Sequence, residues 1–300
     1  MREVAVVTTG FFDGVHLGHR HVIETVVSAA RERGEEAIVV TFWPHPRAVL
    51  QQDARDFRLL NSLEEKKALL LSCGIDRVEV LPFTREFAAM KADAYLQLLR
   101  ERFGASLVVM GYDNRIGSDR LTAQDIKISP RASLGRDDII VISTGAIGGV
   151  EKSLSSTVIR KALEQGRVKE AGAMLGYPYE LYGVVVSGNR MGRTIGFPTA
   201  NMQLYEPLKL VPGNGVYAVE VEVLGCLYRG MTNIGTRPTV GGTARTIETH
   251  ILDFDQDIYG LPLRIRFLRR IRDERKFPSL KDLRVQLLLD SREAVGALIK

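Results

Sequence analysis

The first half of the chain alternates short apolar runs with longer amphipathic segments. Five runs rich in β-branched residues predict strands at 4–8, 37–41, 78–81, 107–110 and 139–142. Between the first two runs, residues 19–33 repeat apolar positions with the i, i+3, i+4 spacing of a helix that buries one face. Strands that alternate with helices predict a parallel sheet covered on both faces, whose ligands bind beyond the carboxyl ends of the strands.

Two more helices follow in this half. Ser62 with Glu65 three residues later predicts a capping box that opens a helix ending at Gly74. Residues 91–103 form the next predicted helix, and the apolar positions of 155–175 predict helices that link the two halves of the chain.

The second half has a different pattern. Short runs separated by Gly and Pro predict strands at 183–187, 216–223, 228–233, 246–253 and 263–268. Many strands with little helix indicate an antiparallel barrel or sandwich, and a last helix is predicted to begin at Pro278-Ser279. A chain of 300 residues exceeds the usual size of one core, so we expect two domains, 1–176 with the linking helices 155–176, and 177–300.

Composition narrows the class of protein. Hydrophobic residues at 45% and charged residues at 26% exclude a mainly disordered chain, and apolar runs stay well short of the roughly 20 residues of a membrane span. The apolar stretch near the N-terminus is too short for a signal peptide, so the cytoplasm is the expected compartment. Cys73 and Cys226 are far apart and lack a partner motif, which supports neither a disulfide framework nor a zinc site.

The charge pattern leaves two interpretations for one basic segment. The formal net charge is +5, and the densest basic stretch, 264–276, begins with alternating Arg and apolar residues. That alternation favours a strand with one face in water over an RNA-binding patch, and no nucleic-acid partner is expected. A modest excess of positive charge also suits an enzyme that acts on polyphosphates.

A candidate phosphate site follows the first predicted strand. His16 and His19 are three residues apart at a helix start, where backbone N–H groups and the helix dipole attract anions. Gly10, Gly14 and Gly18 let the backbone approach a phosphate closely. The spacing matches neither the dinucleotide-binding fingerprint nor the P-loop. The His-x-Gly-His pattern resembles the nucleotidyltransferase superfamily, and the alternative is a pair of capping histidines on an ordinary helix.

A second group near the end of this half suits the same role. The hydroxyls of Ser156 and Thr157 at a helix start are able to meet phosphate oxygens, and Arg160 is able to neutralise their charge. A simple helix cap followed by a surface arginine is the alternative.

Another candidate nucleotide site lies in the second half. A turn that contains Gly188, Gly192 and Arg193 offers backbone N–H groups and a guanidinium to phosphate. Soon after it, Thr199 and Asn201 present a hydroxyl and an amide oxygen, which are hard ligands suited to Mg²⁺.

Phosphorylation of an alcohol also needs a base. Glu248 lies on a predicted strand between Ile247 and Thr249 and is the candidate. A glutamate on a strand is also commonly an exposed cross-strand charge.

Taken together, these motifs resemble one family. Segments 10–19, 41–46, 111–120, 155–160, 192–201, 233–239, 248–254 and 259–260 occur in the order found in the prokaryotic bifunctional riboflavin kinase/FMN adenylyltransferases, also called FAD synthetases. The resemblance implies a C-terminal barrel that phosphorylates riboflavin to FMN with ATP and Mg²⁺. It places Thr199 and Asn201 at the metal and phosphates and makes Glu248 the base.

The resemblance also implies a Rossmann-like N-terminal nucleotidyltransferase domain that joins FMN to AMP from ATP, giving FAD and pyrophosphate. The residues implied around the phosphates are His16, His19, Ser156, Thr157 and Arg160. The residues predicted to contact the flavin are His45, Asp113 and Arg115.

This sequence departs from the family pattern in the N-terminal half. Phe12 stands where asparagine is common, and Asn114 and Ile116 stand where the family usually has aromatic residues. One alternative is therefore a riboflavin kinase whose N-terminal domain is inactive or repurposed. A more remote alternative is a non-enzymatic, flavin-responsive regulator that binds nucleic acid.

Overall fold

The computed structural model describes residues 4–50, 57–112, 114–128, 139–144, 154–188, 191–239 and 242–297. The chain forms two compact units, Met1–Ser156 and Thr157–Lys300. Among the described residues, no helix combines the length and the apolar character that crossing a membrane requires.

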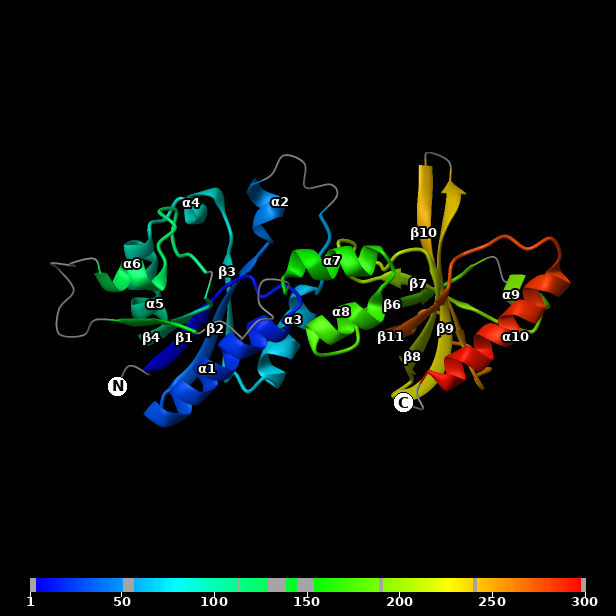
Figure 1. Ribbon diagram of the computed structural model, residues 1–300, viewed down its shortest axis with the longest axis horizontal. Coiled ribbons are helices and arrows are strands. Elements are labelled where there is room, and N and C mark those ends of the chain that lie inside the picture. Colours follow the sequence, from blue (N-terminus) through cyan, green and yellow to red (C-terminus); the bar gives the residue numbers. More distant parts are fainter. Residues whose placement is uncertain are drawn as a thin grey trace. The chain divides into compact units, whose positions relative to one another are not determined.

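The first unit is built on a parallel five-stranded sheet (Figure 1). Its strands are β1 (Ala5–Thr9), β2 (Glu36–Trp43), β3 (Arg77–Pro82), β4 (Ala105–Met110) and β5 (Ile140–Ser143), in the order β3-β2-β1-β4-β5. The chain continues from β1 to β2 on one side and returns to β4 on the other. The carboxyl ends of β1 and β4 therefore form the switch point at which ligands bind in such sheets.

Helices cover both faces of this sheet. The helices are α1 (Leu17–Arg33), α2 (Pro46–Leu50), α3 (Leu63–Ser72), α4 (Arg85–Ala88), α5 (Ala92–Phe103) and α6 (Ala123–Ile128). One core joins Val22, Ile23 and Leu70 of α1 and α3 to the sheet, and a second core joins Leu96 and Leu99 of α5 to the opposite face. The predicted α/β fold with a parallel sheet is confirmed.

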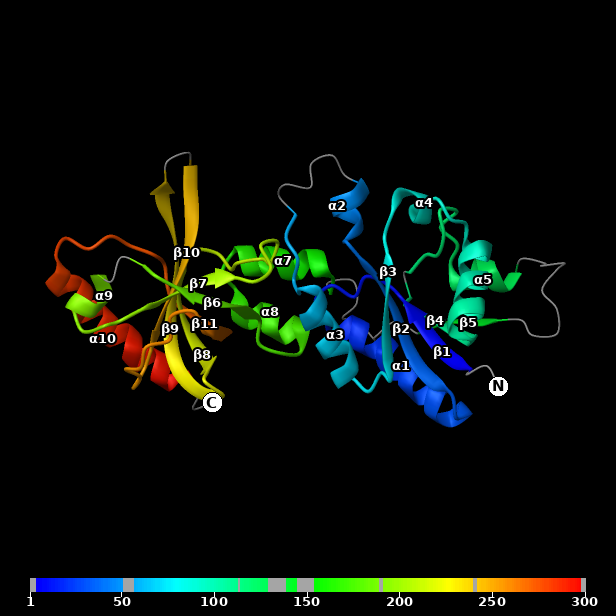
Figure 2. The same cartoon turned by 180° about the vertical axis from the view of Figure 1, so that it is seen from behind.

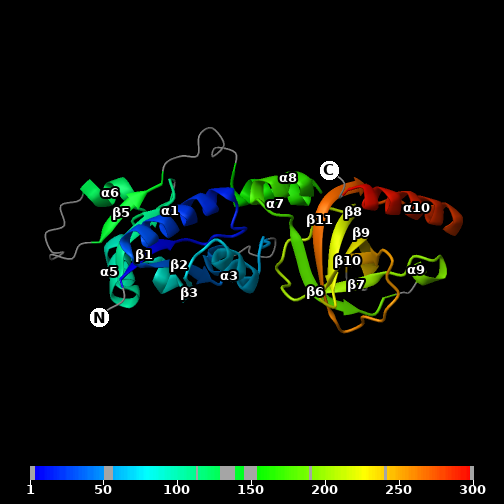
Figure 3. The same cartoon turned by 90° about the horizontal axis from the view of Figure 1, so that it is seen from below.

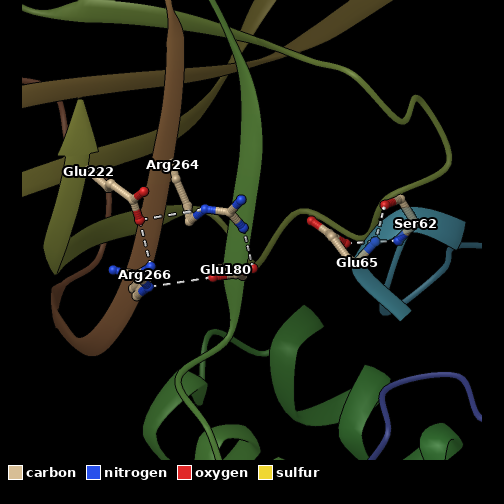
Figure 4. Close-up of polar contacts among 6 residues, drawn as sticks. All are labelled: Ser62, Glu65, Glu180, Glu222, Arg264 and Arg266. Carbon is tan, nitrogen blue, oxygen red and sulfur yellow. Dashed lines mark hydrogen bonds and ion pairs between the residues drawn. The ribbon is translucent and has the colours of Figure 1, made fainter. Parts of the chain in front are cut away.

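The predicted capping box at the start of α3 is present. The Glu65 N–H donates to Oγ of Ser62 over 3.2 Å, and the Ser62 N–H donates to Oε2 of Glu65 over 2.8 Å (Figure 4). Two donors that the helix cannot satisfy internally are thereby paired.

The second unit is a closed antiparallel barrel with flanking helices. It contains α7 (Ser156–Glu164), α8 (Val168–Leu175), β6 (Glu180–Val186), α9 (Met191–Thr194), β7 (Ala200–Leu204), β8 (Gly215–Val223), β9 (Cys226–Thr239), β10 (Gly242–Ile251), β11 (Pro262–Arg272) and α10 (Leu280–Gly296). The strands close in the order β10-β7-β6-β11-β8-β9. Of the two predicted architectures, the barrel is the one observed, and α10 lies along its side (Figure 3).

The helices α7 and α8 lie next to each other (Figure 2), and α8 contacts β11. From Thr157 onward they belong to the same compact unit as the barrel, whereas the sequence pattern predicts them as part of the N-terminal domain. The expected domain boundary after residue 176 stays a prediction.

The start of the basic segment lies in β11, which has one buried face and one partly solvated face. Ile265 is fully buried, while Arg264 and Arg266 alternate with it and reach partly into solvent. Each arginine contacts both Glu180 of β6 and Glu222 of β8, with shortest N–O distances of 2.6 Å to Glu180 from Arg264 and 2.6 Å to Glu222 from Arg266 (Figure 4). The predicted strand with one solvated face is confirmed, and its positive charge is balanced by the two carboxylates.

Candidate active sites

The loop between β1 and α1 has an unusual backbone. Phe12, Gly14 and Val15 have φ angles of 47°, 88° and 36°, all in the left-handed region. Glycine tolerates this region, but a β-branched valine there is strained and persists only where surrounding contacts enforce the conformation. The Gly10 N–H donates to the carbonyl of Val40 over 3.1 Å, which fixes the start of the loop to β2.

Two histidines stand together at the start of α1. The His19 N–H donates to Nδ1 of His16 over 3.3 Å, and the two rings stack with centroids 3.6 Å apart and an interplanar angle of 17°. Because Nδ1 of His16 accepts this hydrogen bond, the neutral tautomer of His16 carries its proton on Nε2.

The second histidine is held neutral by its surroundings. Burial lowers the pKa of His19 well below its usual value of 6.5, and the charges of His16 and Lys66 lower it further. Its Nδ1 is buried and has no hydrogen-bond partner among the described residues. A buried, unpaired imidazole nitrogen at a helix N-terminus is suited to a ligand that brings its own polar atoms.

A cavity of about 330 Å³ opens beside this loop at the switch point. Its wall is mainly aromatic and apolar and includes Phe11, Phe42, Phe83, Phe87, Tyr95 and Met110. Asn114, Arg115 and Ile116 contribute the remaining side. The hydroxyls of Thr9 and Tyr95, which also line it, form a hydrogen bond of 2.5 Å. The cavity suits a flat, largely apolar ring system with polar groups at one end.

A row of polar side chains crosses one wall of the barrel. Glu248 of β10 pairs in register with Asn201 of β7 on one side and with Asn233 of β9 on the other. Cross-strand neighbours have Cβ atoms about 4.5–5.5 Å apart, so the three side chains form one polar strip. The flanking Ile247 and Thr249 are buried.

Two cavities share Thr199, close to this strip. The larger, of about 640 Å³, lies against α10 and is lined by Thr199, Asn201, Asn233, Glu248, Phe277, Leu283 and Leu287 among others. The smaller, of about 420 Å³, is lined by Arg193, Thr199, Asp257 and Tyr259 among others. Thr199 lines both cavities, whereas Glu248 lines only the larger one.

The glycines of the preceding turn are required by close packing. A Cβ atom on Gly188 would collide with the side chain of Asn201, and one on Gly192 would collide with the carbonyl of Phe197 and approach Oγ1 of Thr199 to 3.5 Å. The turn therefore packs on Asn201 of the strip through Gly188, and on Phe197 close to Thr199 through Gly192.

Comparisons with known proteins cover both units. A family model described as FAD synthetase matches residues 1–157, and one described as riboflavin kinase matches residues 175–298. The bifunctional riboflavin kinase/FMN adenylyltransferase of Bacillus subtilis (strain 168) is 36% identical over 294 residues, 97% of this chain and 92% of that protein. The protein of the same name from Escherichia coli (strain K12) is 38% identical over 292 residues, 96% of this chain and 91% of that protein.

This chain belongs to the bifunctional riboflavin kinase/FMN adenylyltransferase family. A crystal structure of a macrolide-efflux protein from Streptococcus pneumoniae shares the fold, with a TM-score of 0.90 and 36% identity, and the match covers 98% of this chain and 94% of that chain. The family recognised in the sequence is thus confirmed.

The structure brings together most of the residues predicted for the kinase half of a family member. One cavity is lined by Gly192, Thr199, Asn201 and Glu248. Gly188 packs against Asn201, and Arg193 lines the adjoining cavity. Their roles in binding metal and phosphate and in removing the proton stay predictions.

The residues predicted for the adenylyltransferase half are placed less completely. His16 and His19 stack, and Oγ of Ser156 donates to the carbonyl of Asp13 over 2.8 Å, so Ser156 contacts the loop itself. Thr157 and Arg160 lie on α7 in the second compact unit, and their part in a phosphate site stays a prediction.

The predicted flavin contacts cluster near the aromatic cavity. Arg115 lines it, and the His45 ring lies 5.3 Å from the ring of Phe11, which lines it as well. Asp113 is outside the described residues. Two of the three departures from the family pattern lie in this wall, where Ile116 is buried and Asn114 provides a polar edge.

Sequence reasoning missed His250, which lies two residues beyond the predicted base. Its Nδ1–H donates to the carbonyl of Pro198 over 2.7 Å, and its ring meets Phe197 edge-on at 5.1 Å. Burial lowers the pKa of His250, partly offset by the bond to Pro198. The alternation of β10 puts His250 on the face of Glu248, and that periodicity was the signal available in the sequence.

Proposed function

We propose that this chain phosphorylates riboflavin to FMN in its barrel and then adenylylates FMN to FAD in its N-terminal unit, consuming ATP in each step. The observation that carries the proposal is that two distinct sites suited to these reactions occur in one chain. One site joins a carboxylate to hard oxygen ligands where two cavities meet. The other joins a histidine-bearing loop to an aromatic cavity.

In the kinase reaction, riboflavin occupies the larger cavity. Of the two cavities, Glu248 lines only this one, so the alcohol that it activates must bind here. The wall formed by Phe277, Leu283 and Leu287 offers apolar surface to the flavin ring. Glu248 removes the proton of the terminal hydroxyl of riboflavin as the oxygen of that hydroxyl attacks the γ-phosphorus of ATP, and ADP leaves.

ATP occupies the smaller cavity in this proposal. Arg193 lines this cavity and faces the phosphates of ATP, and Gly192 lines the larger cavity next to it. Thr199, shared by both cavities, stands where the γ-phosphate passes to riboflavin.

The residues at this junction fit Mg²⁺. Thr199 and Asn201 supply neutral oxygen atoms, and Mg²⁺ in kinases is typically held by one or two protein ligands together with substrate phosphates and water. The glycine at 188 leaves the space in which the Asn201 side chain sits. When bound, the ion would balance charge on the β- and γ-phosphates.

In the adenylyltransferase reaction, the phosphate of FMN attacks the α-phosphorus of a second ATP. A new P–O bond forms, the bond to the leaving pyrophosphate breaks, and FAD results. Since the attacking oxygen is already anionic, charge stabilisation is the main requirement. His16, His19 and the backbone at Gly10, Gly14 and Gly18 supply it, with Ser156, Thr157 and Arg160 as further phosphate contacts.

The flavin ring of FMN occupies the aromatic cavity, near His45 and Arg115. Apart from ATP, the partners of the protein are small flavins. We propose the cytoplasm as the compartment, where both substrates are available.

The direct test is a time course with purified protein, riboflavin, ATP and Mg²⁺, in which flavins are separated by chromatography. FMN is expected to rise and then to convert to FAD. If FMN is not converted to FAD, even when FMN is supplied directly, then only the barrel is active and the second half of the proposal is wrong.

A further inference from the structure

A charged side chain is buried beneath the loop that carries the histidines. Lys66 of α3 is 5% exposed, and its ammonium group donates to the carbonyl of Phe11 over 3.1 Å and to Oγ1 of Thr41 over 3.0 Å. The Thr41 hydroxyl in turn donates to the same Phe11 carbonyl over 3.4 Å. One carbonyl of the loop is therefore fixed from both β2 and α3.

A second residue of this loop, Asp13, accepts hydrogen bonds from the backbone just before α3. Asp13 is also 5% exposed, and its carboxylate accepts the N–H groups of Leu60 over 3.0 Å and of Asn61 over 3.2 Å, directly before the cap of α3. Its carbonyl accepts the Ser156 hydroxyl. Lys66 and Asp13 interact electrostatically as well.

These contacts enclose the strained part of the loop. Phe12 lies between the two tied residues, and Val15 follows two positions later, both with positive φ. Such conformations cost about 1–3 kcal/mol each and need neighbours that enforce them. Both histidines follow within a few residues, so the ties at Phe11 and Asp13 set where their rings stand.

We propose that Lys66 and Asp13 are positioning residues for adenylyl transfer, which hold the histidine-bearing loop in its phosphate-binding form; the inference rests on the proposed adenylyltransferase activity. Neither residue touches substrate. Lys66 acts through the Phe11 carbonyl and Asp13 acts through the start of α3.

The burial of Lys66 supports a functional reason for its position. Desolvation lowers its pKa from 10.5 to about 8, against the opposing effect of Asp13. Because burial of the ammonium group costs solvation free energy, Lys66 stabilises the fold less than an apolar side chain of similar size would. Its charge also lowers the pKa of His19. Asp13 of the loop and His19 of α1 are the titratable groups whose charges interact with that of Lys66, while β2 presents the uncharged Thr41.

The test compares Lys66→Met with Lys67→Met and Lys66→Arg. Lys67 is the next residue of α3, reaches partly into solvent and forms a weak surface pair with Glu64 over 3.4 Å, so it is a matched control. FAD formation from supplied FMN is expected to fall about 10- to 100-fold in Lys66→Met, the scale of a displacement of roughly 1 Å at a reacting group. Lys67→Met should match the wild type, and Lys66→Arg should retain most of the activity.

Further readouts separate positioning from a loss of folding. Riboflavin phosphorylation by the same Lys66→Met sample should be unchanged. In the wild type, FAD formation should decline as pH rises past about 8, where Lys66 loses its charge, and this decline should be absent in Lys66→Arg. In a double-mutant cycle, Asp13→Asn should cost much less in the Lys66→Met background than in the wild type.

FAD formation by the wild type tests the proposed adenylyltransferase activity itself. If the wild type forms no FAD, that proposed activity is wrong, whatever the variants do. Given an active wild type, a Lys66→Met protein with full FAD formation would overturn the inference. Equal losses in Lys66→Met and Lys67→Met, or identical pH profiles of wild type and Lys66→Arg, would overturn it as well.

Discussion

Arg272 and Asp290 form a two-pronged ion pair that joins the last strand of the barrel to α10. Nε of Arg272 lies 3.0 Å from Oδ1 of Asp290, and Nη2 lies 2.7 Å from Oδ2. Asp290 is only 1% exposed and also accepts the amide of Gln286 over 2.7 Å. Since α10 carries Leu283 and Leu287 in the wall of the larger cavity, this pair holds that wall in place.

Removal of the carboxylate should therefore weaken both stability and riboflavin binding. We expect Asp290→Ala to lower the unfolding free energy of the barrel by about 3–5 kcal/mol, because the partly buried guanidinium of Arg272 and the amide of Gln286 both lose their buried partner. The KM for riboflavin should rise more than kcat falls. Denaturant unfolding and steady-state kinase assays measure the two effects.

The matched control for this prediction is Glu293→Ala on the same helix. Glu293 pairs with Arg269 over 3.1 Å, but its side chain is 53% exposed, and exposed pairs contribute about 0–1 kcal/mol. If both variants lose the same stability, the pair between Arg272 and Asp290 does not anchor α10.

The glycine turn of the kinase site should tolerate no side chain at position 192. Gly192→Ala places a methyl group against the carbonyl of Phe197, which must move together with Thr199 two residues later. We expect riboflavin phosphorylation to fall at least 10-fold while FAD formation from FMN persists. Gly296→Ala near the end of α10, where a Cβ meets open space, should leave both activities unchanged. Normal phosphorylation by Gly192→Ala would show that the turn does not set the position of Thr199.

Lys66 should also leave a signature in the pH dependence of stability. Its pKa is about 8 in the folded protein and 10.5 in the unfolded chain, so between these values the unfolded state binds more protons. The unfolding free energy of the wild type should therefore rise relative to that of Lys66→Met as pH increases from 8 to 10.5. Denaturant unfolding of both proteins across this range gives the difference, and a flat or falling difference would show that Lys66 is not buried in its charged form.

The sequence predicted the fold because its elements have strong local signals. The alternation of buried and exposed positions in β11 and the capping box at Ser62 were confirmed. Short elements such as α9 and β7 escaped prediction, because four or five residues carry little periodicity.

The site was predictable where a motif is contiguous, as for Thr199 and Asn201. Lys66 was missed because its neighbours Glu64, Glu65 and Lys67 make α3 resemble a solvated helix at this point, and only tertiary packing buries one of the two lysines. The aromatic cavity escaped for a related reason, since Phe11, Phe42 and Phe83 come from separate segments of the chain.

The central claim is that two independent sites in one chain act in sequence on a flavin. The most direct measurement assays FMN and FAD formation from riboflavin by Glu248→Gln, by His19→Ala and by an equal mixture of the two. Glu248→Gln should lose about 100- to 10,000-fold in FMN formation yet convert supplied FMN to FAD. His19→Ala should accumulate FMN, and the mixture should restore FAD. If each variant loses both activities while folded, or the mixture yields no FAD, the two reactions do not occupy separate sites.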